Sequence, residues 1–223
     1  MNTIWVPLLL SLKVAGWATL IACVTGIGIA YALSRWPSRW CDLLDSILTL
    51  PMVLPPTVIG YYLLVLFGRR STLGQYLSSL GIELVFTWQG AVVAASVVAF
   101  PMVLKAARAA FEDVDVRIED AARVLGIGSV AVFFRVSLPM AARGIFAGVL
   151  LAFARALGEF GATLMIAGSI PGRTQTMSIA IYEAVQAGDD QLATFLVIVI
   201  SITCVVVLWS ASALSPRQMR RER

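Results

Sequence analysis

Five long runs in which charge is absent or nearly absent limit the folds open to this chain. Four of them contain no Asp, Glu, Lys or Arg, and the remaining run contains one Arg and one Glu. About 20 helical residues cross the apolar core of a bilayer, which is roughly 30 Å thick. The runs are continuous rather than alternating, which favours helices over barrel strands. We therefore expect transmembrane helices over residues 14–33, 46–67, 84–104, 144–166 and 193–214.

The composition agrees with a bilayer as the solvent. Hydrophobic residues make up 59% of the 223 residues and charged residues 13%, whereas soluble domains carry about 25% charged residues. No linker or solenoid-type repeat divides the chain. The sequence therefore predicts an all-α, polytopic membrane protein with about five transmembrane helices, forming one transmembrane domain over residues 1–223, with membrane lipid around it.

The placement of basic residues predicts the orientation of these helices. With Arg155 inside the fourth run left aside, twelve Lys and Arg residues fall in the segments 34–45, 105–143 and 215–223, and four fall on the other side. Cytoplasmic loops carry the excess of Lys and Arg. We therefore expect the N-terminus outside, the C-terminus in the cytoplasm, and residues 112–139 on the cytoplasmic side of a bacterial inner membrane.

The segment 112–139 is a long charged loop between apolar runs. Its first half is acidic, an apolar helical patch follows, and Gly126 and Gly128 interrupt that patch as a turn signal. The pattern predicts a helix, a turn and a short helix that leads into the fourth run. Phe133 and Phe134 then offer apolar anchors to a partner's groove. A solvated amphipathic linker is the alternative reading of such a loop.

The spacing within this loop resembles a known motif. Asp120, Ala121 and Ala122 are followed by three residues, Gly126, nine residues, and then Val136-Ser137-Leu138-Pro139. This is similar to the Glu-Ala-Ala loop of permeases of type I ABC importers. Two positions depart from the family pattern, because Asp120, with Glu119 beside it, stands where Glu is usual and Val136 stands where Ile is usual.

The resemblance implies that the loop is a cytoplasmic coupling helix that docks on a soluble ATPase. It also implies two ATP-binding subunits, which use ATP and Mg, and a periplasmic or extracellular oxyanion-binding protein. A second copy of the chain is expected too, because five helices alone make a thin wall for an alternating-access path. The coupling residues expected on this basis are Glu119, Asp120, Ala121, Ala122, Gly126, Phe133, Phe134, Leu138 and Pro139.

Further segments narrow the resemblance to permeases for molybdate, tungstate and sulfate. Residues 154–163 read ARALGEFGAT, which is similar to a segment those permeases share. Residues 50–61, 170–174 and 180–182 look most like the molybdate branch, and the similarity extends over about residues 10–215. The resemblance implies ATP-driven molybdate import, with sulfate/thiosulfate or tungstate import as the near alternative.

Two charges inside the fourth run are candidates for the pathway or a gate. Arg155 and Glu159 are four residues apart, so they are expected to share one helix face, and a charge at the bilayer centre is costly unless it faces protein or water. Either a structural ion pair or a pathway element accounts for them. Pro55 and Pro56, with Pro51, predict a kink or break in the second run, either as packing or as a hinge.

The outer stretch 168–191 holds Arg173 and Thr174, which can bind oxyanions; a solvated loop is the alternative reading. The resemblance places this stretch near the outer gate and the dock of the binding protein.

Several classes of function are disfavoured by what the sequence lacks. It has no histidine and no Gly-rich phosphate loop, so we expect no catalytic residues, no metal site, no cofactor bound by this chain and ATP hydrolysis in a separate subunit. The net charge is +4, but the basic residues lie in short loops and not on one long face, so we expect no nucleic acid partner. A stand-alone secondary transporter is less favoured, since no inverted repeat with paired broken helices is visible.

Overall fold

A computed structural model describes residues 2–36 and 38–214, and within them all regular structure is helical. A π-helical segment, Phe133–Ser137, joins α7 to α8. The α-helices are α1 (Asn2–Arg35), α2 (Arg39–Val53), α3 (Pro56–Phe67), α4 (Thr72–Ser79), α5 (Trp88–Glu112), α6 (Val116–Val124), α7 (Ser129–Val132), α8 (Leu138–Leu157), α9 (Gly161–Ala167), α10 (Met177–Gln186) and α11 (Asp190–Leu214).

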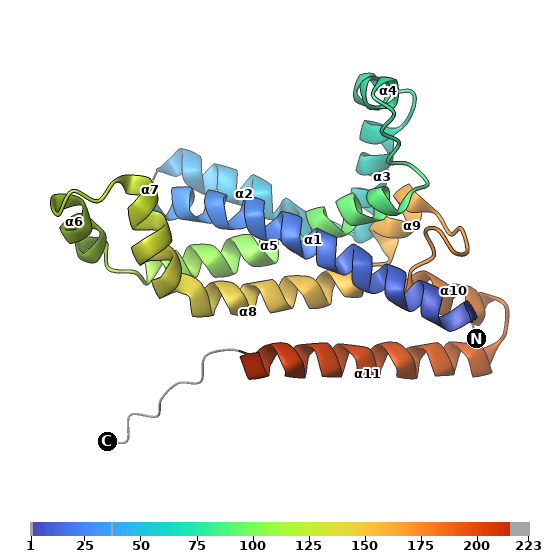
Figure 1. Cartoon of the computed structure of the whole chain (residues 1–223). Helices are drawn as coiled ribbons and strands as arrows, with labels where there is room; N and C mark the ends of the chain where they lie inside the picture. The colour runs from blue at the N-terminus through green and yellow to red at the C-terminus, as the bar shows by residue number, and fades with distance from the viewer. Residues whose placement is uncertain (1, 37, 215–223) are drawn as a thin grey trace.

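The centre of the bundle is built from α1, α5 and α8, which lie alongside one another (Figure 1). Small residues make this close approach possible, because helices in lipid associate through tight packing rather than through a hydrophobic driving force. The buried alanines of these three helices include Ala15, Ala18, Ala22, Ala91, Ala94, Ala95, Ala99, Ala152 and Ala156. Within the part of the chain that the structure describes, four helices are long and apolar enough to cross a membrane alone, and a fifth span results if the bent pair α2 and α3 is counted as one.

The second apolar run is broken where its prolines predict a kink. Helix α2 ends at Val53, Pro55 and Pro56 start α3, and the two helix axes differ by 109°. Proline has no N–H to continue the helix, which explains why the break falls there. Helix α3 then packs against α9, so closely that a Cβ on Gly60 would lie 2.6 Å from Cβ of Met165.

The helix that contains most of the third run extends beyond the run's C-terminal end. Helix α5 extends past Leu104 to Glu112 because the charges there find partners on α2. The Lys105 ammonium bonds to Asp45, and Arg108 Nη1 lies 3.2 Å from the Asp45 carboxylate. Pairing across the two helices lets α5 continue beyond the run predicted from hydrophobicity.

The fourth run was predicted as one span, and this prediction is wrong in its second half. Helix α8 begins at Leu138, earlier than expected, and ends at Leu157; after a three-residue break, α9 covers Gly161–Ala167. Gly158 follows α8 as its C-cap and Gly161 begins α9, and glycine is common at such positions. Residues 144–166 therefore form two helices joined by a polar turn.

The described elements place different features at the two ends of the bundle (Figure 1). Helices α6 and α7 lie at one end, whereas α9, α10 and the start of α1 lie at the other. Helix α3 projects sideways from that second end and carries α4 at its tip, and α11 runs back toward the end that holds α6. The charged loop and the start of the chain are thus on opposite ends.

Candidate coupling loop and transport site

The loop has the helix, turn and short helix that its sequence predicts. Helix α6 begins at Val116, where the Asp115 carboxylate accepts a hydrogen bond from the N–H of Arg117 at 2.9 Å. It ends at Val124, and Gly126 follows with a φ of 84°. That left-handed conformation is the one that glycine tolerates and other residues resist, so Gly126 sets the direction in which α7 leaves the turn.

The turn presents apolar side chains to its surroundings. Val124 is 87% exposed and Leu125 is 81% exposed, and Val130 and Phe134 are also exposed. Four apolar side chains on one short stretch form a surface of the kind that a partner's groove covers. Ala121 is exposed on the same helix, while Ala122 is buried.

Two residues expected at this surface point inward instead. The Phe133 ring lies 4.8 Å from the Tyr31 ring and 6.0 Å from the Phe111 ring, measured between centroids, and so belongs to the core between α1 and α5. Leu138 packs against the same core, whereas Pro139, in the first turn of α8, is exposed. The expected anchor role of Phe133 needs correction, because its ring packs into this core and only Phe134 remains exposed.

Glu119 and Asp120 are adjacent but lie in different environments. Asp120 is exposed and bonds to Arg123 at 2.7 Å. Glu119 is 0% exposed and accepts hydrogen bonds from Arg35 and from the Ser137 hydroxyl. Burial raises the pKa of Glu119, but these bonds outweigh burial and hold the pKa below its ordinary value. Asp120 alone of the two is available to a partner.

Arg155 and Glu159 form an ion pair at the break between α8 and α9, at the end of the bundle opposite the charged loop. Arg155 Nη1 lies 2.7 Å from Glu159 Oε2, so the predicted pair exists. Glu159 is not on the same helix, however, because it follows the end of α8. Its Oε1 accepts a hydrogen bond from the N–H of Ala162 at 2.8 Å, in the first turn of α9. The carboxylate thus joins the end of α8 to the start of α9, where the helix dipole favours an anion.

The two outer candidates differ in availability. The Thr174 hydroxyl is buried, accepts from the N–H of Ile170 at 3.0 Å and donates to the Gly168 carbonyl at 3.3 Å. These bonds hold the loop in shape, so the expectation that Thr174 offers its hydroxyl to an oxyanion needs correction. Arg173 is exposed and has no acidic partner among the described residues.

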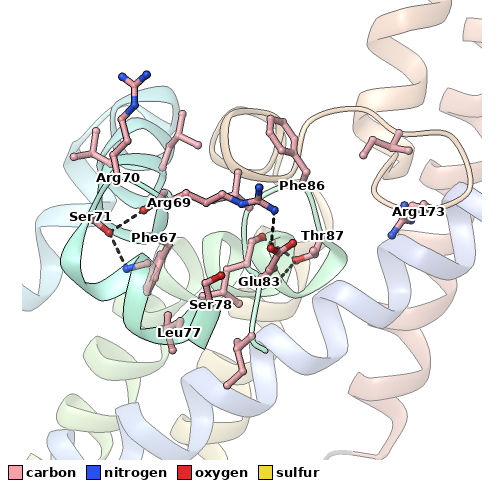
Figure 2. A pocket seen from close by; sticks show the side chains of 18 residues that line it. Phe67, Arg69, Arg70, Ser71, Leu77, Ser78, Glu83, Phe86, Thr87 and Arg173 are labelled. Atoms are coloured by element: carbon pink, nitrogen blue, oxygen red, sulfur yellow. Dashed lines mark hydrogen bonds and ion pairs between the residues drawn. The ribbon is translucent and has the colours of Figure 1, made fainter. Parts of the chain in front are cut away.

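Arg173 lines an open cavity of about 960 Å³ between α3, α4 and the segment that leads into α5. Figure 2 shows Arg69 reaching Glu83 across this cavity, with Arg70 directed away from the pair. The wall combines these charges with apolar side chains such as Phe67 and Leu77. The cavity therefore has an excess of positive charge, at the end of the bundle opposite the charged loop.

Sequence reasoning missed Arg35, Ser137 and the cluster of Asp45, Lys105 and Arg108. A signal existed for the cluster, since Asp45 directly precedes one apolar run and Lys105 directly follows the next, which places opposite charges at one level of the membrane. Arg35 likewise closely follows the first run, on the side of the acidic loop. No group of three or more His, Cys, Asp or Glu residues placed to hold a metal ion occurs among the described residues.

Comparison with known proteins decides the family. A family model described as the inner membrane component of binding-protein-dependent transport systems matches residues 5–220. The chain belongs to this family. The resemblance read from the Glu-Ala-Ala-like loop is thereby confirmed, and the chain is a transport component in a family of membrane subunits.

Members of this inner-membrane family resemble the chain to different degrees. The molybdenum transport system permease protein ModB of Escherichia coli K12 is 46% identical over 209 residues, covering 92% of this chain and 91% of the relative. ModB of Haemophilus influenzae is 40% identical over 204 residues, covering 90% and 89%. The sulfate transport system permease protein CysT of Salmonella typhimurium is 34% identical over 204 residues, covering 92% and 74%.

Solved structures of ABC transporters share the fold. A chain of the inward-facing MetNI methionine ABC transporter superposes with a TM-score of 0.76 at 14% identity, covering 96% of this chain and 94% of that one. A chain of a bacterial ABC transporter that imports alginate gives 0.78 at 16% identity, covering 99% and 81%. The predicted fold class, an all-α permease of the type I ABC importer kind, is confirmed.

Proposed function

We propose that this chain is the membrane-spanning permease subunit of an ATP-driven importer that carries molybdate across the cytoplasmic membrane. The observation that carries the proposal is the near full-length similarity to molybdenum permeases, at 40–46% identity in the two relatives above. The sulfate permease is similar over the same part of the chain but at 34%. Molybdate and sulfate are both tetrahedral oxyanions, so sulfate import is the second candidate.

The charged loop is the proposed docking site for the ATPase. We propose that two copies of this chain assemble with two ATP-binding subunits, which use ATP and Mg. Each ATP-binding subunit docks on the exposed surface that Val124, Leu125, Val130 and Phe134 form on one copy. Asp120 lies at the edge of this surface and is exposed. Burial of the apolar side chains in the ATPase groove then provides the attachment, at roughly 25 cal/mol for each Å² of apolar surface removed from water.

The opposite end receives the substrate. We propose that a periplasmic oxyanion-binding protein docks over the cavity lined by Arg69, Arg70 and Arg173, with the N-terminus of the chain outside and the C-terminus in the cytoplasm. The excess of positive charge there attracts an acidic protein surface and lowers the energy of a nearby oxyanion. The polar break at Arg155 and Glu159 lies at this same end of the bundle and is the candidate gate.

Alternating access requires elements that change their relative position. The break between α2 and α3 and the break between α8 and α9 are the places where the backbone already departs from continuous helix, and hinges are commonly found at element ends. Closure of the ATPases pulls the loop, and the helices that follow these breaks reorient around the path.

Uptake of radiolabelled molybdate tests the substrate. Cells that lack their own molybdate importer would express this chain with its ATPase and binding protein. We expect uptake that survives a large excess of unlabelled sulfate and disappears when the ATPase gene is omitted. Suppression of uptake by sulfate would favour sulfate import instead, and labelled tungstate accumulating in the presence of excess molybdate would make tungstate the substrate.

A further inference from the structure

Helix α6 is attached to the bundle by charge more than by apolar packing. Of its nine residues, only Glu119 and Ala122 are buried. Ala122 contributes little apolar area because its side chain is a single methyl group. A helix that must transmit movement therefore depends for its position on one buried carboxylate.

That carboxylate is held from two elements outside α6. Arg35, the last residue of α1, donates from Nη2 to Oε1 at 2.5 Å and from Nε to Oε2 at 3.1 Å. The Ser137 hydroxyl, in the π-helical segment before α8, donates to Oε1 at 2.7 Å. Arg123 of α6 itself approaches Oε2 at 3.3 Å from the exposed side.

The guanidinium of Arg35 also reaches the end of α5. Its Nη1 donates to the Phe111 carbonyl at 3.1 Å, one residue before the end of that helix. A cation at a helix C-terminus is favoured by the helix dipole. One arginine and one glutamate thus connect α1, α5, α6 and the start of α8, although 84 residues separate the two side chains in sequence.

We propose that Arg35 and Glu119 form a clamp that makes α6 move as one body with α1, so that movement of the coupling loop enters the bundle through α1 as well as through α8. The chain itself joins α6 to α5 through residues 113–115 and to α8 by way of the turn and α7, but it gives α6 no direct link to α1. Two-point arginine–carboxylate bonds fix direction as well as distance, and breaking one partner of a buried pair is costly. This proposal rests on the proposed function, since it takes the loop to be the site of ATPase docking.

The clamp makes a prediction that a merely stabilising ion pair does not make. A structural pair would change the amount of assembled protein, while the ratio of molybdate transported to ATP hydrolysed would stay the same. A clamp that carries movement sets this ratio and also limits the spread of distances between α6 and α1.

Both quantities can be measured on Glu119→Gln in the complex with ATPase and binding protein. Uptake per ATP hydrolysed would be followed in proteoliposomes. The distance between α1 and α6 would be followed by spin labels at Ala32→Cys and Arg117→Cys, both exposed positions, in a background without the three native cysteines. Asp113→Asn, an exposed acid in the same loop, is the matched control.

We expect the ratio of uptake to hydrolysis to fall about tenfold in Glu119→Gln, within the range of coupling energies between sites, and the distance distribution to broaden. Asp113→Asn should match the wild type in both. An unchanged ratio or an unchanged distribution in assembled Glu119→Gln complex would overturn the clamp. Should that variant fail to assemble, Arg35→Lys, which keeps the charge but loses the two-point bond, decides by the same two criteria.

A failure of the clamp can be told apart from a failure of the proposed function. Absence of molybdate uptake by the wild-type complex would count against the proposed function. The distance between α1 and α6, measured with and without ATP, reports on the clamp whatever the transported anion is.

Discussion

Removal of Arg155 should destabilise the protein more than neutralisation of its partner Glu159. The Glu159 side chain is 1% exposed and the Arg155 side chain 30% exposed. In Arg155→Ala, a buried carboxylate keeps only the N–H of Ala162 as a partner. In Glu159→Gln, the amide oxygen still accepts that bond and the arginine left behind can reach water or headgroups. The cost therefore depends on which charge remains.

The expected magnitudes follow from these exposures. Loss of one partner of a well-buried pair costs about 3–5 kcal/mol, and the partial exposure of Arg155 puts Arg155→Ala near the lower limit, at about 3 kcal/mol. Glu159→Gln should cost about 1 kcal/mol, as for one neutral hydrogen bond replacing a charged one. The double variant Arg155→Ala/Glu159→Gln leaves no charge and should recover about 2 kcal/mol of the single loss.

Thermal unfolding of the detergent-solubilised complex, followed by the fraction that stays monodisperse after heating, gives the ranking. For a chain of this size, about 3 kcal/mol corresponds to a shift of about 6–12 °C. Glu83→Gln, in the exposed pair with Arg69, is the control and should cost no more than about 1 kcal/mol. Equal shifts for the two single variants, or no recovery in the double variant, would refute the reasoning and would mean that both charges are solvated.

Three more outcomes are expected. Gly126→Ala should cost about 1–2 kcal/mol from its left-handed φ and lower uptake, whereas Gly128→Ala, whose φ is −63° with open space around it, should leave uptake unchanged; equal uptake in the two variants would contradict the role of the turn. Cysteines introduced at the exposed residues Gln75 and Arg117, in a background without the native ones, should react with an impermeant reagent from outside and from the cytoplasm respectively, and the reverse pattern would overturn the orientation. Because the folded pKa of Glu119 is lowered, its stabilising contribution is present above its ordinary pKa of 4.5 and is lost as the pH falls through the folded value; the difference in unfolding temperature between wild type and Glu119→Gln should be constant above about pH 5.5 and shrink in acid, and a difference that grows on acidification would contradict this sign.

Hydrophobicity located the membrane helices but not their ends. The uncharged run that stops at Leu104 gave no sign that α5 reaches Glu112, because the continuation depends on Asp45, which is 60 residues away in sequence from Lys105. A prediction from hydrophobicity ends the span at the first charged residue. In the structure the helix continues past that residue, because its charge is paired with a residue on the neighbouring helix. Such pairing is a tertiary property that a window along the chain does not contain.

The break after α8 shows the same limit in another form. The spacing of Arg155 and Glu159 predicts an ion pair correctly but assumes one continuous helix. The pair survives the break because the backbone turns at Gly158 and the carboxylate caps α9 instead. Glycine near the end of an apolar run is compatible with either outcome, so periodicity alone could not decide between them.

In the charged loop, the motif located the turn and the short helix that follows it. It did not show that Glu119 is buried and Asp120 exposed, because this depends on Arg35 at the end of another helix. It also did not separate Phe133 from Phe134, since the π-helical segment shifts the direction of side chains relative to an α-helix. Local spacing thus identified the site, and contacts distant in sequence determine which of its residues face a partner.

The central claim is that this chain forms an ATP-driven molybdate path. The most direct test is uptake of labelled molybdate into proteoliposomes that contain the purified chain with its ATPase, with ATP enclosed on the ATPase side and the binding protein added on the other. We expect accumulation that requires all three proteins and ATP, and that stops when the loop surface is changed by Leu125→Asp. Accumulation by the chain without the ATPase, or none by the complete system when labelled sulfate is imported in its place, would contradict the account.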